Sequence, residues 1–187
     1  QQHGNIASVG FALYCSMLEE AIAKAQHKTV TKTVEVDPVI DLGIDAFIDE
    51  AYINDTARKI TIYQRLLQIR KLEDFDEFTD ELIDRFGSPT PPVERLLKLA
   101  RIKERARAIG IKSMVIREGV LIIHWADLEK MADWDPGLVA TKVWQHVKID
   151  KNNVLRYSPI EEGASVLTTV EVLMGELEKR DPALQSQ

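Results

Sequence analysis

The chain has 187 residues, 45% of them hydrophobic and 29% charged, and this composition is typical of a globular protein rather than a disordered one. Its formal net charge of -6 argues against a dedicated nucleic-acid-binding protein, because neutralising phosphate groups requires an excess of lysine and arginine. A single cysteine excludes an internal disulfide, and no apolar run approaches the roughly 18 residues of a membrane-spanning helix. We therefore expect a cytoplasmic protein.

The N-terminal part of the chain is expected to lie outside the main domain. Apolar residues recur at spacings of three and four through residues 11–26, which predicts an amphipathic helix. Residues 1–27 are interpreted as the end of a preceding module and residues 28–38 as a linker. The main domain is predicted at residues 39–182, followed by a frayed tail at residues 183–187. Because the sequence opens without a methionine or a leader pattern, we expect a piece of a longer protein.

The first half of the main domain is predicted to contain a strand and two helices. Apolar and polar residues alternate from Ile40 to Ala46, which indicates a half-buried strand. The first helix is expected to begin at a cap, Asn54 or Asp55. The second runs from about Asp74 to Phe86 and ends at Gly87. The buried faces are predicted as Ile60, Tyr63, Leu66 and Leu67 in the first helix, and Phe75, Phe78, Leu82, Ile83 and Phe86 in the second.

The second half is predicted to mix helices with a hairpin. A helix capped by Thr90 and opened by Pro91 should run to Ile109. Strands at 113–117 and 120–124 flank Glu118-Gly119, a two-residue hairpin turn. The remaining elements are predicted as a helix at 135–147, a short strand at 154–157 and a last helix at 163–180. The fold class is therefore α+β, a small mixed sheet covered by several helices, with the strand order left open.

The sequence offers no recognisable catalytic, cofactor-binding or metal site. Its nine glycines do not form a phosphate-binding loop, so ATP binding of the P-loop type is excluded. No two of the four histidines have the spacing of a helical metal pair. No serine lies in a nucleophile-elbow pattern. We therefore expect a chain that is not itself an enzyme, although a hydrolase with an unfamiliar site stays open as an alternative.

Two consecutive helices carry opposite charge. Residues 73–85 contain seven acids and one base, whereas residues 94–112 contain seven bases and two acids. One interpretation is two solvated faces that attract each other, which would contribute little because exposed ion pairs are weak. The other is a surface for a partner, since a row of acids repels itself until a basic surface covers it.

Four charged residues of the acidic helix are expected to share one stripe. Glu77, Glu81, Asp84 and Arg85 lie at i, i+4, i+7 and i+8, and Asp80 flanks them. The packing of the helix does not require Glu81, Asp84 or Arg85 in this interpretation. These three residues are therefore the candidates for an interface.

Three motifs in this order resemble a known family. The first is Gly4-Asn5-Ile6-Ala7-Ser8-Val9-Gly10-Phe11-Ala12-Leu13-Tyr14-Cys15. The second is Ala46-Phe47-Ile48, followed by Tyr52-Ile53, Arg58, Tyr63 and Arg65-Leu66. The third is Asp80-Glu81-Leu82-Ile83-Asp84-Arg85-Phe86-Gly87, with a proline corner and Leu96-Leu97. Together they resemble the C-terminal domain of bacterial transcription-repair coupling factor (Mfd). The chain departs from that pattern at Asp49 and Ser88, where the family often has proline.

The resemblance implies a regulatory role in DNA repair. Proteins of this family are ATP-driven DNA translocases that displace stalled RNA polymerase and recruit the excision-repair protein UvrA. Their C-terminal domain packs on a UvrB-like module of the same chain, masks UvrA binding and restrains the motor. By this resemblance Glu81, Asp84 and Arg85 would form the interdomain contact, facing basic and aromatic residues. ATP and Mg²⁺ would bind elsewhere in the parent protein, and no membrane partner is expected.

A nucleic-acid-binding module is the alternative function. It would use the basic helix at 94–112 to contact phosphates. That helix lacks interleaved aromatic residues for base stacking, which weakens this alternative.

Overall fold

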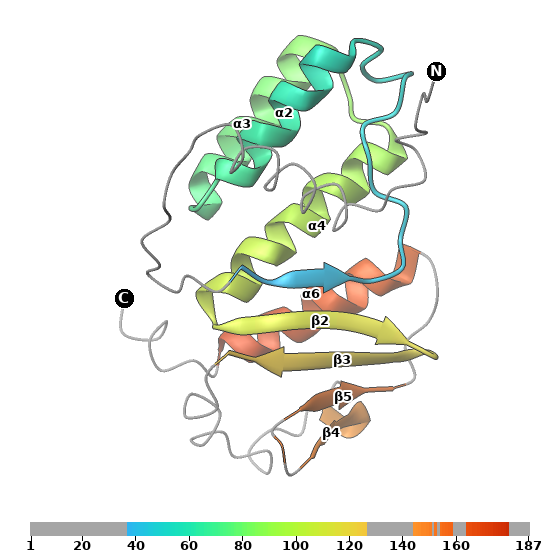
Figure 1. Cartoon of the computed structure of the whole chain (residues 1–187), viewed down its shortest axis with the longest axis vertical. Helices are drawn as coiled ribbons and strands as arrows, with labels where there is room; N and C mark the ends of the chain where they lie inside the picture. Colours follow the sequence, from blue (N-terminus) through green and yellow to red (C-terminus); the bar gives the residue numbers. More distant parts are fainter. Residues whose placement is uncertain (1–36, 127–143, 151, 153, 159–163, 180–187) are drawn as a thin grey trace, which may run out of the picture. The chain divides into compact units, whose positions relative to one another are not determined.

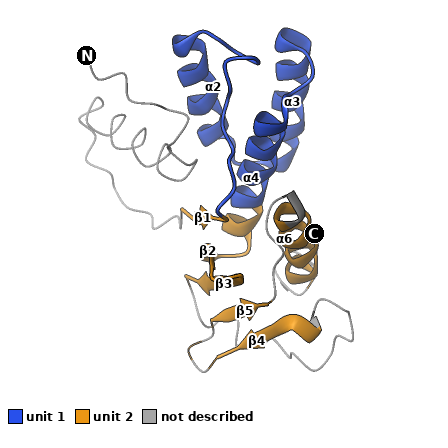
Figure 2. Ribbon diagram, turned by 90° about the vertical axis from the view of Figure 1, so that its right-hand side faces the viewer, with its two compact units in different colours: residues 1–35, 43–104 blue, residues 36–42, 105–187 orange. Residues whose placement is uncertain are grey.

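The structure is a computed structural model, and it describes residues 37–126, 144–150, 152, 154–158 and 164–179. Its described residues form two compact units, one of residues 43–104 and the other of residues 37–42 together with the described residues from 105 to 179 (Figure 2). The expected N-terminal helix, most of the linker and the tail lie outside the described residues.

The second unit is built on a five-stranded mixed sheet with the order β1-β2-β3-β5-β4 (Figure 1). Its strands are β1 (Val39–Asp41), β2 (Ile111–Arg117), β3 (Val120–Trp125), β4 (Val147–Ile149) and β5 (Leu155–Tyr157). β1 pairs with β2 in parallel, and the other neighbours pair antiparallel. The predicted α+β class is confirmed, and so is the hairpin, because Glu118 and Gly119 have φ values of 51° and 72°, as a tight primed turn requires.

Helix α6 (Ala164–Glu178) covers one face of this sheet (Figures 1 and 2). Apolar side chains of the helix and the sheet are fully buried, with no exposed surface, because both elements turn an apolar face inward. They are Met114, Leu121, Ile123, Leu155, Leu173, Met174 and Leu177.

The first unit consists of helices α2 (Thr56–Gln68) and α3 (Leu72–Phe86), residues 91–104 of helix α4 (Pro91–Ala108) and a preceding loop. Asp55 caps α2 as predicted, since its carboxylate accepts a hydrogen bond from the backbone N–H of Arg58 at 2.7 Å. The unit's core is apolar, and its helical members include Ile62, Tyr63, Leu66, Phe75, Phe78, Leu82, Val93 and Leu96.

Several predictions of local structure are wrong. β1 ends at Asp41, although burial goes on alternating to Ala46, because Gly43 turns the backbone at φ 65°. Ile60 and Ile83 are 36% and 40% exposed, and Ile62 replaces Ile60 in the core.

The end of the helix predicted at 135–147 is also wrong. Trp144–His146 form a 3₁₀ turn, and Val147–Ile149 form β4, which pairs with β5 and has β-branched residues at both of its ends. Residues 135–143 of the predicted helix lie outside the described part.

Candidate interaction surface on helix α3

The C-terminal end of α3 is anchored to the loop before α2. Gly87 donates its backbone N–H to the carbonyl of Ile83 at 2.8 Å, the last bond of the helix. The helix ends at Gly87 as predicted, but the glycine has φ 81° and ψ −170° and so lacks the left-handed helical conformation expected of it. The hydroxyl oxygen of Tyr52 lies 3.1 Å from the carbonyl oxygens of both Leu82 and Gly87. Burial raises the pKa of this hydroxyl, so Tyr52 stays a neutral hydrogen-bond donor.

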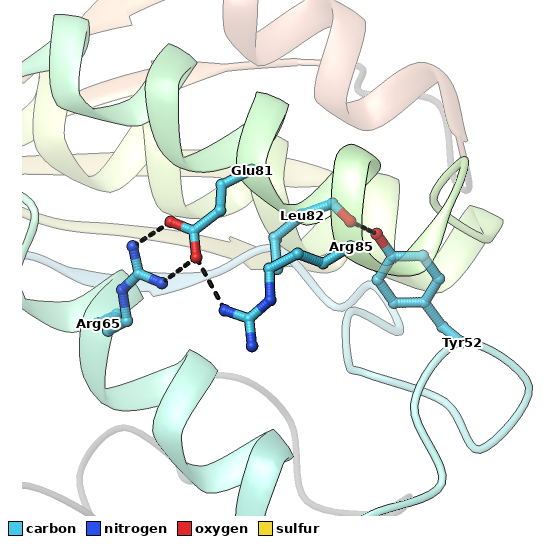
Figure 3. A network of polar contacts seen from close by, with 5 residues as sticks. All are labelled: Tyr52, Arg65, Glu81, Leu82 and Arg85. Carbon is cyan, nitrogen blue, oxygen red and sulfur yellow. Dashed lines mark hydrogen bonds and ion pairs between the residues drawn. The ribbon is translucent and has the colours of Figure 1, made fainter.

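Glu81 of α3 lies between two arginines (Figure 3). Arg65, on α2, donates from Nη1 to Oε1 at 2.7 Å and from Nη2 to Oε2 at 2.5 Å. Arg85, one turn further along α3, donates from Nη1 to the same Oε1 at 2.9 Å. The fork of Arg65 matches the two carboxylate oxygens, which is the strongest geometry for such a pair.

These contacts lower the pKa of Glu81. The hydrogen bonds from Arg65 and then Arg85 lower the pKa of its carboxyl group from 4.5 to about 2. The same contact raises the pKa of Arg65. Both charges are therefore held on the pair well below neutral pH.

Each arginine also lies over an aromatic ring of α3. The guanidinium carbon of Arg65 is 5.1 Å from the ring centre of Phe78, and that of Arg85 is 5.3 Å from the ring centre of Phe86. Such cation–π contacts restrain the arginine side chains. Phe78 in turn is packed in the core of the unit, where it is 5% exposed. Phe86 is half-buried, with its ring centre 5.9 Å from that of Tyr52.

A second set of charges on α3 is free. Glu73, Glu77, Asp80 and Asp84 follow one another at i, i+4, i+7 and i+11, so they form a single acidic row along the helix. All four are exposed, and within the part of the chain that the structure describes none has a hydrogen bond or ion pair. Asp76, off this row, pairs with Arg101 of α4 at 2.6 Å.

The structure places Glu81, Asp84 and Arg85 on the same helix end but divides them by role. Asp84 is exposed and free among the described residues, and Arg85 keeps a side chain that is 57% exposed. Glu81, in contrast, links α2 to α3, so the expectation that the fold does not require it is wrong. Arg65 was missed as a site residue because nothing in local spacing connects it to Glu81, 16 positions later.

Asp49 makes a turn by hydrogen bonding. One of its carboxylate oxygens accepts from the backbone N–H of Tyr52 at 2.8 Å, and the other accepts from the hydroxyl of Thr90. Thr90 still begins α4 through its carbonyl, to which the N–H of Glu94 donates at 2.9 Å. The Asp49 carboxylate therefore ties the loop before α2 to the residue that precedes α4.

The bases of the predicted basic helix are mostly engaged. Arg95 donates to the carbonyl of Asp45, and Lys103 is 7% exposed. Three others are ion-paired, with Asp76, Glu178 and Asp37; these are Arg101, Arg105 and Arg107. Lys98 and Lys112 are the two exposed bases of 94–112 without a partner among the described residues. This arrangement does not favour the nucleic-acid alternative, which needs several free cations.

No group of three or more histidine, cysteine, aspartate or glutamate side chains among the described residues is arranged to hold a metal ion. No helix in the described part of the chain is both long enough and apolar enough to cross a membrane.

Comparisons with known proteins connect these features to a family. Residues 42–133 match the family model of the TRCF domain. The transcription-repair-coupling factor of Bacillus subtilis (strain 168) is 45% identical over 107 residues, which cover 57% of this chain and 9% of that protein. The factor of Rickettsia bellii (strain RML369-C) is 29% identical over 177 residues, covering 95% of this chain and 16% of that protein. The chain thus spans a small part of these relatives.

A solved structure gives the same result for the fold. The crystal structure of a C-terminal domain of transcription-repair coupling factor superposes with a TM-score of 0.65, covering 79% of this chain and 95% of that one. The sequence identity in that comparison is 20%, so it speaks for the fold alone. The sequence matches confirm the resemblance drawn from the motifs: residues 42–133 of the chain belong to the TRCF domain family.

Proposed function

We propose that this chain is the regulatory domain of a longer transcription-repair coupling factor. In this proposal it packs on a UvrB-like module of the same protein, masks the surface that binds UvrA and restrains an ATP-driven DNA translocase. ATP and Mg²⁺ would bind to the motor part, which would also act on DNA and stalled RNA polymerase. Family membership and the small share of each relative that the chain spans support this assignment.

The observation that carries the proposal is the acidic row of Glu73, Glu77, Asp80 and Asp84. Four exposed carboxylates on one side of a helix repel one another, and the described residues offer them no cation. A basic surface would relieve this repulsion and gain complementary charge.

The chemistry of this surface suits a contact that has to open. A regulatory coupling between two sites is typically about 1–3 kcal/mol, far less than a large apolar interface would contribute. A contact made mainly by exposed charges lies in this range and weakens as salt screens it. The same surface can therefore hold the inactive state and release it without unfolding either partner.

The test is a charge reversal in the full-length factor. Asp84→Arg leaves the Arg65–Glu81–Arg85 contacts untouched and places a cation in the acidic row. We expect the affinity for UvrA to rise by about fivefold or more. The basal ATPase rate should rise as well, because the motor is no longer restrained. Glu50→Arg is the matched control, because Glu50 is also an exposed acid without a partner among the described residues and lies outside α3. An unchanged UvrA affinity and ATPase rate in Asp84→Arg would contradict the proposal.

A further inference from the structure

The contacts of Glu81 form a relay between two helices. Arg65 of α2 holds both oxygens of the carboxylate, at 2.7 and 2.5 Å, and Arg85 shares Oε1 at 2.9 Å (Figure 3). A carboxylate has about four acceptor positions, and three of those on Glu81 are thus used inside the unit. Glu81 has little capacity left to bind a partner directly, so its influence on a partner has to pass through the groups it holds.

We infer that Arg65 is a positioning residue for the regulatory contact: it fixes Glu81, which fixes the guanidinium of Arg85 to receive a carboxylate of the UvrB-like module. This inference rests on the proposed function. In this inference Glu81 does not contact the partner but positions Arg85. Arg65 joins the candidate site from α2, whereas Glu81, Asp84 and Arg85 lie on α3.

The guanidinium of Arg85 is preorganised to bind a ligand. It is held at Nη1 by Glu81 and lies 5.3 Å from the ring centre of Phe86. Its Nε and Nη2 have no partner among the described residues, and its side chain is 57% exposed. An Nε–Nη2 edge binds a carboxylate through two parallel hydrogen bonds. Because the side chain is already ordered, binding loses less conformational entropy than it would with a free arginine.

The charges of the relay support an acidic partner group at this point. Two guanidinium groups and one carboxylate leave the cluster of Arg65, Glu81 and Arg85 with a net charge of about +1. The neighbouring acidic row is negative along its whole length. The surface of α3 therefore offers a cation beside several anions, and such a mixed pattern selects for one partner orientation more sharply than charge of a single sign.

The first test measures the order of Arg85 in the 187-residue chain. We compare ¹⁵N relaxation of the Arg85 Nε in the wild type, in Arg65→Met and in Arg58→Met. Arg58 is the matched control because it lies on the same helix, is exposed and has no side-chain partner among the described residues. We expect the order parameter of the Arg85 Nε to fall in Arg65→Met alone. Equal order in all three proteins would overturn the inference.

The second test is a double-mutant cycle in the full-length factor, read out as affinity for UvrA. Arg65→Met alone should raise this affinity about three- to tenfold, the effect of one side chain that has to be ordered again on binding. In combination with Arg85→Ala it should add nothing to the effect of Arg85→Ala. A purely structural role would instead give additive effects, since loss of stability persists in either background. Additive effects would therefore overturn the inference.

Asp84→Arg distinguishes a failure of the positioning role of Arg65 from a failure of the proposed regulatory contact. If Asp84→Arg raises UvrA affinity while Arg65→Met does not, the regulatory contact stands and the positioning role of Arg65 fails. If Asp84→Arg, Arg85→Ala and Arg65→Met all leave UvrA affinity unchanged, the proposed function itself fails, and the partner assigned to Arg85 fails with it.

Discussion

Arg105 and Glu178 form a two-pronged ion pair that joins the end of α4 to the end of α6. The Nε of Arg105 donates to Oε1 at 2.6 Å and its Nη2 donates to Oε2 at 2.8 Å. The two side chains are 17% and 28% exposed, so the pair is largely shielded from water. The contact raises the pKa of Arg105, which keeps its charge under all ordinary conditions.

Glu178→Ala should lower the free energy of unfolding by about 2 kcal/mol. The substitution leaves the charge of Arg105 shielded without its partner, and a shielded charge that has lost its hydrogen bonds is costly. Lys179→Ala is the control, because Lys179 is 74% exposed and pairs with Glu176 three residues earlier. It should change stability by no more than about 0.5 kcal/mol. Urea unfolding measures both, and equal effects would contradict the assigned importance of the shielded pair.

The low pKa of Glu81 predicts how stability depends on pH. In the folded chain this pKa is about 2, against an ordinary value of 4.5. Between these values the unfolded state binds more protons, so stability rises with pH across this window and falls as the solution is acidified toward pH 2. Asp150, whose pKa is lowered by the N–H groups of Asn152 and Val154, acts in the same direction.

The measurement is the urea midpoint between about pH 2 and 6 in wild type and Glu81→Gln, which removes the titrating group. The variant should show a flatter dependence than the wild type in that window and a lower midpoint above it. Parallel curves would mean that the Arg65–Glu81 pair does not persist in solution.

Asp49→Ala should destabilise the first unit by about 1–3 kcal/mol, because the N–H of Tyr52 and the hydroxyl of Thr90 both lose their acceptor. The control is Asp45→Ala, since the contact of Asp45 with Arg95 uses its backbone carbonyl rather than its carboxylate. Thermal unfolding followed by circular dichroism compares the two. If Asp45→Ala is as costly as Asp49→Ala, the stabilising role given to the Asp49 turn is wrong.

Two neighbouring apolar residues of α3 should respond very differently to truncation. Leu82 is 3% exposed, and Leu82→Ala should cost about 2–5 kcal/mol through lost burial and a cavity. Ile83 is 40% exposed, and Ile83→Ala should cost well under half of that. Denaturant titration of both variants checks this difference, which would vanish if Ile83 were part of the core.

Features governed by local chemistry could be predicted from the sequence. Asp55 caps its helix, Gly87 ends another, and Glu118-Gly119 closes the hairpin, because in each case a short stretch of chain satisfies its own backbone. The predicted burial of Phe75, Phe78 and Leu82 on α3 is confirmed, because helical spacing places these three residues on one face. Ile83 was assigned wrongly because spacing places it only at the edge of that stripe, and neighbouring elements decide whether an edge is covered.

Features that depend on distant segments could not be predicted. Arg65 and Glu81 meet because α2 and α3 pack side by side, and Asp49 meets Thr90 across 41 positions of chain. The predicted helix includes Val147, the first residue of β4, because the three residues of this strand gain their strand structure only by pairing with β5. The motifs gave the family, but the division of the candidate site into a relay and a free acidic row required the structure.

The most direct test of the regulatory role is the binding of this 187-residue chain to a coupling factor that lacks it, measured with and without UvrA. If the chain masks the UvrA-binding surface, UvrA and the chain compete, and by thermodynamic reciprocity saturating UvrA should weaken the binding of the chain by about fivefold or more. Asp84→Arg should weaken binding when UvrA is absent. Binding of equal affinity in the presence and absence of UvrA would contradict the account.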